Sequence, residues 1–132
     1  MKAICTYCAG PKNTDGRVLP AVDRYVSTRI DQLHDLARKR GEAFYILSGE
    51  YGLLKPDQLI PWYDHLLLAD EVEALVPEVV ASLAGEGISE LVYYTADANA
   101  VVAVAPYLEV IRSACSQAGI ELAVENIPGN PD

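Results

Sequence analysis

Short runs of apolar residues alternate along this chain with longer stretches in which apolar residues recur every three or four positions. The runs lie at residues 2–7, 43–47, 90–95 and 120–124, and the helical stretches at residues 20–40, 70–85 and 106–118. The run at residues 43–47 (AFYIL) is almost wholly apolar, which is typical of a strand buried on both faces of a parallel sheet. The alternation predicts a three-layer α/β fold, with a mainly parallel four-stranded sheet in the order 2-1-3-4 and helices on both faces.

The length of 132 residues is that of one domain, which we place at residues 1–132. No apolar run approaches the ~20 residues that a membrane-spanning helix needs, and the opening MKAICTYC has no apolar core of a signal peptide. We therefore expect a cytoplasmic protein without a membrane partner. The C-terminal residues 126–132 are expected to run from order into a frayed end.

The net charge of −9, from 19 acidic and 10 basic residues, bears on the class of partner. An extended nucleic-acid surface needs clustered Lys and Arg side chains, so the charge disfavours one. The net charge does not exclude a small, local basic pocket. In such a pocket, phosphate would be held by Lys12, Arg24, Arg29 or backbone amides.

Ligands of parallel α/β sheets bind beyond the carboxyl ends of the strands, at the point where the strand order reverses. In this chain those ends carry residues 8–12, 48–51 and 95–99. The sequence therefore predicts a site at one sheet edge, built from three loops that are distant along the chain.

The first of these loops follows a Cys-x-x-Cys pair, Cys5 and Cys8. Redox chemistry needs the first cysteine exposed at a helix N-terminus, whereas Cys5 falls inside a predicted strand and is expected in the core. With three cysteines and no matching histidine spacing, neither a disulfide framework nor a zinc site is expected. Cys8, Gly10 and Lys12 form either an ordinary turn with a solvated lysine or a ligand-facing loop.

The second loop, residues 48–52 (SGEYG), places a hydroxyl, a carboxylate and a phenol beside two glycines. It is either a tight turn that needs glycine, with Tyr51 covering the core, or part of a site. A carboxylate such as Glu50 at the end of a buried strand needs a partner or a cleft. There it can act as a general acid or base, hold a ribose hydroxyl, or pair with Lys12. The pattern is not G-x-S-x-G, which disfavours a nucleophile-elbow hydrolase.

Residues 61–65 (PWYDH) place two aromatic rings beside an acid and an imidazole. Trp62 and Tyr63 either anchor the loop on the core or form a stacking wall for a base, with Asp64 as a polar contact. An isolated histidine such as His65 is more typical of a surface or of a helix start than of a catalyst.

Residues 46–64 (ILSGEYGLLKPDQLIPWYD) resemble the signature of the YaaA family of peroxide stress resistance proteins, I-L-S-G-x-Y-G-[LV]-L-x-P followed by a hydrophobic pair and P-Y. The chain is more similar still to a family of small uncharacterised bacterial and phage proteins, which carry a Cys-x-x-x-Lys loop, a Tyr-x-[SG] helix start and I-L-S-[AG]-x-[YH]-G-L-L. The matching pieces here are Cys8 with Lys12, Tyr25 with Ser27, and residues 46–64. The resemblance covers the first half of the chain, and beyond residue 68 only the alternation of elements matches.

The long YaaA proteins are linked to oxidative stress and DNA binding, the latter through segments additional to the stretch matched here. The Cys-x-x-x-Lys loop also resembles one in domains associated with deazaguanine tRNA modification, which are related in fold to uracil-DNA glycosylases. The resemblance thus implies a nucleobase or nucleotide ligand. Two departures remove support for transferring individual contacts: residues 8–13 read CAGPKN where several lysines are common, and Trp62 stands before Tyr63 where the family has Pro-Tyr.

We therefore expect a nucleotide- or nucleobase-handling enzyme that acts at an N-glycosidic bond, with no metal and no cofactor. Lys12 would hold phosphate, and Glu50 would be the acid or base or the ribose contact. Further roles and ligand contacts are assigned to Ser48 (catalytic positioning), Asp64 (polar positioning), Tyr51 and Tyr63 (stacking), and Cys8, Gly10, Tyr25, Gly49 and Thr95 (binding). The alternative is a non-catalytic ligand-binding or stress-response module that uses the same cleft. Direct DNA binding is disfavoured by the charge, and the sequence leaves the oligomeric state open.

Overall fold

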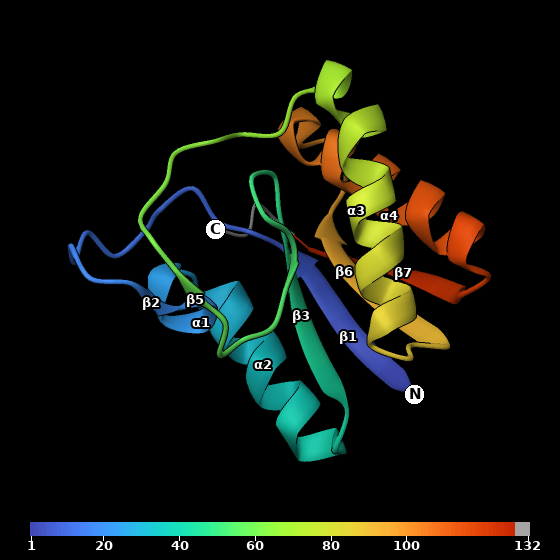
Figure 1. Ribbon diagram of the computed structural model, residues 1–132, viewed down its shortest axis with the longest axis horizontal. Coiled ribbons are helices and arrows are strands. Elements are labelled where there is room, and N and C mark those ends of the chain that lie inside the picture. The colour runs from blue at the N-terminus through green and yellow to red at the C-terminus, as the bar shows by residue number, and fades with distance from the viewer. Residues whose placement is uncertain (129–132) are drawn as a thin grey trace.

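A five-stranded mixed sheet forms the centre of this computed structural model, which describes residues 1–128 (Figure 1). Its strands lie in the order β4-β3-β1-β6-β7. They are β1 (Lys2–Tyr7), β3 (Ala43–Ser48), β4 (Gly52–Leu54), β6 (Glu90–Ala96) and β7 (Glu121–Ile127). All neighbouring pairs are parallel except β3 and β4.

Helices cover both faces of this sheet, as a three-layer α/β architecture requires (Figure 1). On one side lie α1 (Ala21–Arg24) and α2 (Thr28–Arg40), and on the other α3 (Val72–Gly85) and α4 (Ala105–Ala118). Two short 3₁₀ turns, η1 (Ala69–Glu71) and η2 (Val102–Val104), lead into α3 and α4. The central strand β1 is buried on both faces, with only Lys2 exposed, because helices pack above and below it.

The expected four-stranded sheet in the order 2-1-3-4 is wrong in its strand count, and the full strand order differs with it. The four expected strands follow one another as β3, β1, β6 and β7, and β4 adds an antiparallel edge beside β3. The chain reverses between Ser48 and Gly52, which pair directly, and Gly52 has φ +73°, a left-handed angle that suits glycine. The strand β4 was not among the expected strands, because GLL is too short to show a strand period.

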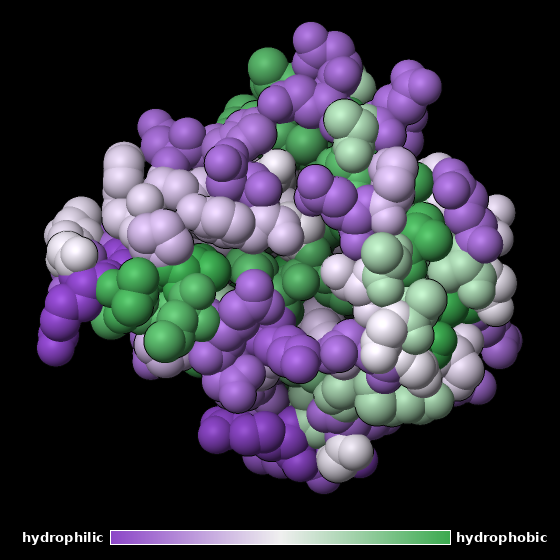
Figure 2. All heavy atoms as spheres, in the orientation of Figure 1, coloured by the Kyte–Doolittle hydropathy of each residue, from purple (hydrophilic) through white to green (hydrophobic). Residues whose placement is uncertain are grey.

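A second, two-stranded sheet joins β2 (Leu19–Pro20) to β5 (Leu59–Ile60). Val18 and Leu59 at this small sheet are exposed, and Figure 2 shows a hydrophobic patch on the side of the molecule where β2 and β5 lie. The pairing of β2 with β5 connects the segment before α1 to the segment after β4. Pairs of residues carry no periodicity, so the sequence did not predict this sheet.

The single helix expected over residues 20–40 is wrong, because the chain leaves the helical conformation at Tyr25. Tyr25 has φ −86° and ψ 133° and forms an isolated antiparallel bridge with Lys12. Ser27 then caps α2, its side-chain oxygen accepting a hydrogen bond from the backbone N–H of Ile30 at 3.1 Å. The break brings the start of α2 against the loop after β1.

Three further sequence expectations can be compared with the structure. The thiols of Cys5, Cys8 and Cys115 are free and buried, so Cys5 lies in the core as expected and no disulfide forms among them. None of the helices within residues 1–128 has the length and apolar content needed to cross a membrane. The expectation of a frayed end for residues 126–132 falls, from residue 129 onward, outside the described residues.

Candidate functional site

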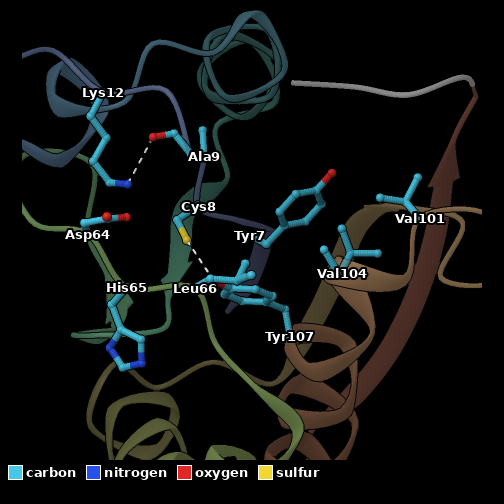
Figure 3. Close-up of a pocket in the computed structure, with 12 residues that line it drawn as sticks. Tyr7, Cys8, Ala9, Lys12, Asp64, His65, Leu66, Val101, Val104 and Tyr107 are labelled. Carbon is cyan, nitrogen blue, oxygen red and sulfur yellow. Dashed lines mark hydrogen bonds between the residues drawn. The ribbon is translucent and has the colours of Figure 1, made fainter.

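A cavity of about 210 Å³ opens at the carboxyl end of β1 (Figure 3). Three segments line it: the end of β1 with the loop that follows, residues 64–66, and the turn η2 with the start of α4. The lining residues are Tyr7, Cys8, Ala9, Gly10 and Lys12, then Asp64, His65 and Leu66, and finally Val101, Ala103, Val104 and Tyr107. The cavity therefore depends on segments that are far apart in sequence.

The topology explains why the cavity is here. From β1 the chain passes to β3 on one side, and from β3–β4 it crosses to β6 on the other side of β1. The connections beyond β1 and β6 diverge at this switch point and leave a crevice, which is where open α/β sheets bind ligands. Of the three loops expected at the site, residues 8–12 supply part of the cavity wall, whereas residues 48–51 and 95–99 do not line it. The other walls are formed by residues 64–66 and by the segment from Val101 to Tyr107.

The inner wall of the cavity is aromatic and apolar. The rings of Tyr7 and Tyr107 lie 6.1 Å apart at 42°, and the Cys8 thiol donates to the Tyr107 hydroxyl at 3.6 Å. The backbone N–H of Leu67 donates to the same hydroxyl at 3.0 Å. Burial raises the pKa of Tyr107, so the phenol stays neutral at physiological pH.

Lys12 and Asp64 lie together on one side of the cavity (Figure 3). The Lys12 ammonium donates to the Gly10 carbonyl at 3.2 Å and lies 4.7 Å from the ring centroid of Tyr63 and 5.9 Å from that of Tyr25. Neither Lys12 nor Asp64 forms an ion pair with another residue in the described part of the chain. One side of the cavity thus offers both a cation and a carboxylate to a ligand.

Behind Lys12, three hydroxyls form a buried hydrogen-bonded chain. The Ser48 hydroxyl lies 2.9 Å from the Tyr63 hydroxyl, which lies 2.5 Å from that of Tyr25. Ser48 also accepts from the backbone N–H groups of Glu50 and Tyr51, each at 3.1 Å. Burial raises the pKa of both Tyr25 and Tyr63. None of these side chains lines the cavity, and Ser48 is fully buried.

Residues 61–68, here called the strap, run from β5 to η1 without regular secondary structure and supply the third wall of the cavity. Gly49 allows the strap to lie close to the β3–β4 turn. A Cβ atom on Gly49 would be 3.1 Å from the Leu67 Cβ, 3.2 Å from the Leu67 nitrogen and 3.3 Å from the His65 carbonyl oxygen. Gly49 thus contacts the strap rather than the cavity.

His65 on the strap bridges two carboxylates. Its Nδ1 lies 2.5 Å from the Glu50 Oε2 and its Nε2 lies 2.7 Å from the Glu71 Oε2. The other Glu71 oxygen accepts from the backbone N–H of Leu68 at 2.9 Å. The pKa of His65 is raised, mainly by the hydrogen bond to Glu50, and that of Glu71 is lowered by the Leu68 amide and by His65.

The remaining residues singled out from the sequence lie elsewhere. Thr95 is buried and donates to the carbonyl of Ala96 at 3.0 Å, and Tyr51 packs edge-on against Tyr63 with ring centroids 5.2 Å apart. Neither lines the cavity, whereas Cys8, Gly10, Lys12 and Asp64 do.

The two arginines considered for phosphate binding are both used to hold the main chain. Arg24 has no exposed surface, and its guanidinium donates to the carbonyls of Asn13, Asp15, Arg17 and Ile60. Arg29 donates to the Thr6 hydroxyl at 2.7 Å and to the carbonyls of Tyr7 and Cys8. Of the three basic residues considered for phosphate binding, Lys12, Arg24 and Arg29, only Lys12 lines the cavity.

Sequence reasoning missed Tyr107 and the partnership of His65 with Glu71. Tyr107 stands directly after a proline in the first turn of a helix that follows a strand end. A polar aromatic residue at such a position points to the carboxyl edge of the sheet, so a signal was present. The sequence carries no comparable signal for Glu71, because its hydrogen bond with His65 depends on the path of the strap.

No group of three or more His, Cys, Asp or Glu side chains within residues 1–128 is arranged to hold a metal ion. No curated protein and no solved structure is significantly similar to the chain. A family model described as a family of unknown function, DUF6884, matches residues 7–126, a range that includes every residue lining the cavity. The chain belongs to this family.

Proposed function

We propose that the chain binds a nucleobase-containing small molecule in the cavity beyond β1 and β6. The observation that carries the proposal is the position of this cavity at the switch point of the sheet, where α/β proteins bind ligands. Its lining is also of the right kind: an aromatic and aliphatic inner wall, with a few polar groups gathered on one side.

The size of the cavity limits what part of a ligand it can enclose. At about 210 Å³ it is smaller than the ~300–1,000 Å³ of pockets that hold drug-sized molecules. One planar ring system fits this description better than a whole nucleotide does. Sugar and phosphate groups would then lie at the opening, where Lys12 can donate to a phosphate oxygen.

The enzymatic form of the proposal is cleavage or exchange at an N-glycosidic bond. Glu50 was expected to act as its acid or base, but the Glu50 carboxylate is bonded to His65 and does not line the cavity. Asp64 lines the cavity, so we assign it the acid–base role in this form. A non-catalytic binding protein would use the same contacts, with no product formed.

A panel of nucleobases, nucleosides and nucleoside monophosphates, screened by thermal shift and titration calorimetry, tests the proposal. Lys12→Gln should weaken monophosphate binding by about tenfold to a hundredfold, as expected for loss of a charge-assisted hydrogen bond, and leave nucleoside binding unchanged. Lys39→Gln is the control, because Lys39 pairs with Asp35 on α2 at 3.0 Å and does not line the cavity. If no member of the panel binds, the proposal is wrong.

Alkylation of Cys8 locates the ligand. Cys8 lines the cavity, whereas Cys5 and Cys115 are almost wholly buried, and burial raises the pKa of Cys115 to about 11. Iodoacetamide should therefore modify Cys8 first, and a bound ligand should slow that reaction. Chromatography of the same mixtures for released base separates the enzyme from the binding protein.

A further inference from the structure

Side-chain contacts, rather than a backbone ladder, hold the strap at the cavity. Tyr63 bonds to Ser48 and Tyr25, and His65 to Glu50 and Glu71. The backbone N–H of Leu67 donates to the Tyr107 hydroxyl. Segments secured by so few groups are expected at the low end of local stability. The position of the strap is therefore sensitive to the state of any one of these side chains.

Among these groups, His65 is the one whose type of side chain gains or loses its charge near neutral pH. Both ring nitrogens face carboxylate oxygens, at 2.5 Å and 2.7 Å, and an ionised carboxylate can only accept hydrogen bonds. A neutral imidazole carries one N–H, so its other nitrogen would present a lone pair to a carboxylate. Both contacts are satisfied only by the imidazolium.

We propose that His65 is a pH-sensitive clasp: the imidazolium holds the strap against the cavity, and loss of its proton releases the strap and opens the ligand site. This inference deepens the proposed function and rests on it for the ligand. The clasp itself concerns the ligand-free chain and can be tested without any ligand.

The charges around His65 come from several elements. Glu50 faces it from the β3–β4 turn and Glu71 from η1, while Asp64 precedes it on the strap. Lys12, from the loop after β1, and Tyr107, from α4, line the same cavity. The carboxylates outweigh the cation, in accord with a His65 pKa above its ordinary value of 6.5.

The sign of the pH effect follows from that direction. A folded-state pKa above the unfolded value means that the contribution to stability is fully present below the unfolded pKa and is lost as pH rises through the folded pKa. The strap is therefore held at mildly acidic pH, and it is released as the pH rises through the raised pKa of His65.

Trp62 provides the measurement, because it is the single tryptophan of the chain and lies on the strap, half-exposed. Its emission maximum and its quenching by acrylamide should be followed in the ligand-free protein from about pH 5.5 to about pH 9, across the range where histidine titrates. We expect one single-proton transition with a midpoint above 6.5, and greater quenching on its alkaline side.

Variants assign that transition to the clasp. His65→Gln should abolish it, and His34→Gln should leave it intact, since His34 on α2 is the only other histidine and its pKa is lowered. Glu50→Gln should move the midpoint down toward 6.5, because the Glu50 hydrogen bond is the main cause of the raised pKa. Glu50 is exposed, so this variant remains informative if His65→Gln folds poorly, which circular dichroism would show.

The absence of a Trp62 transition, or its persistence unchanged in His65→Gln, would overturn the clasp. Nucleoside monophosphate affinity measured across the same pH range separates this result from the proposed function. A Trp62 transition without any nucleotide binding supports the clasp and contradicts the assigned ligand. Nucleotide binding without a Trp62 transition supports the ligand and contradicts the clasp.

Discussion

At the scale of single residues, Gly49 shows how the sequence motif and the structure are related. The motif at residues 46–64 singled out Gly49 as a ligand contact, and the structure places it against the backbone of Leu67 instead. The missing side chain makes room for the strap. A motif residue can therefore be needed for a site without touching what the site binds.

Gly49→Ala should destabilise the fold by about 1–3 kcal/mol, because the added methyl would press on the Leu67 nitrogen, a backbone atom that cannot simply rotate away. Thermal and urea unfolding measure the loss. Gly16→Ala is the matched control, since nothing lies within 4 Å of its Cβ position. Equal stability of the two variants would show that the strap does not lie close to Gly49.

The places of residues in the fold were predictable from the sequence where they follow from position along a strand. Cys5 inside β1 was expected in the core, and Lys12 after β1 was expected at the sheet edge. The partner of Glu50 was not predictable in this way. Its carboxylate meets His65, which stands 15 residues further on, because the strap returns across the β3–β4 turn. No local pattern encodes that path.

At the scale of elements, the Tyr63 hydroxyl joins three segments that the sequence treats as separate. It links the end of β3 through Ser48, the strap through its own backbone, and the break between α1 and α2 through Tyr25. The strands β2, β4 and β5 escaped prediction because two or three residues cannot show a strand period. The longer strands had enough residues to show one.

Tyr63→Phe should cost about 1–3 kcal/mol of unfolding free energy, because Ser48 and Tyr25 would each lose a buried partner. Tyr51→Phe should have almost no effect, since Tyr51 is partly exposed and its contact with Tyr63 is made by the ring. Chemical denaturation of both variants against the parent chain provides the comparison. A loss no larger than that of Tyr51→Phe would mean that the hydroxyl chain adds nothing to stability.

At the scale of the whole molecule, the three-layer arrangement was predictable because strands and helices alternate strictly. The site was predictable only in its location, since the carboxyl edge follows from topology whereas the third wall is irregular chain. Membership of the DUF6884 family over residues 7–126 shows that the cavity belongs to the part the family shares, and it adds no activity. Support for a nucleobase ligand therefore comes from the geometry of the cavity and not from membership of the family.

The contacts of the buried Arg24 predict that the loop of residues 13–17 resists proteolysis. Its guanidinium holds the carbonyls of Asn13, Asp15 and Arg17, so an exposed loop with an exposed Arg17 side chain is fixed from inside. A protease needs such a segment to detach and extend before cleavage.

Lysine cannot reproduce the guanidinium fork. Arg24→Lys should therefore expose the Arg17 bond to an arginine-specific protease, as mass spectrometry of timed digests would show. Arg38→Lys, on the exposed side of α2, should leave the cleavage rate after Arg17 unchanged.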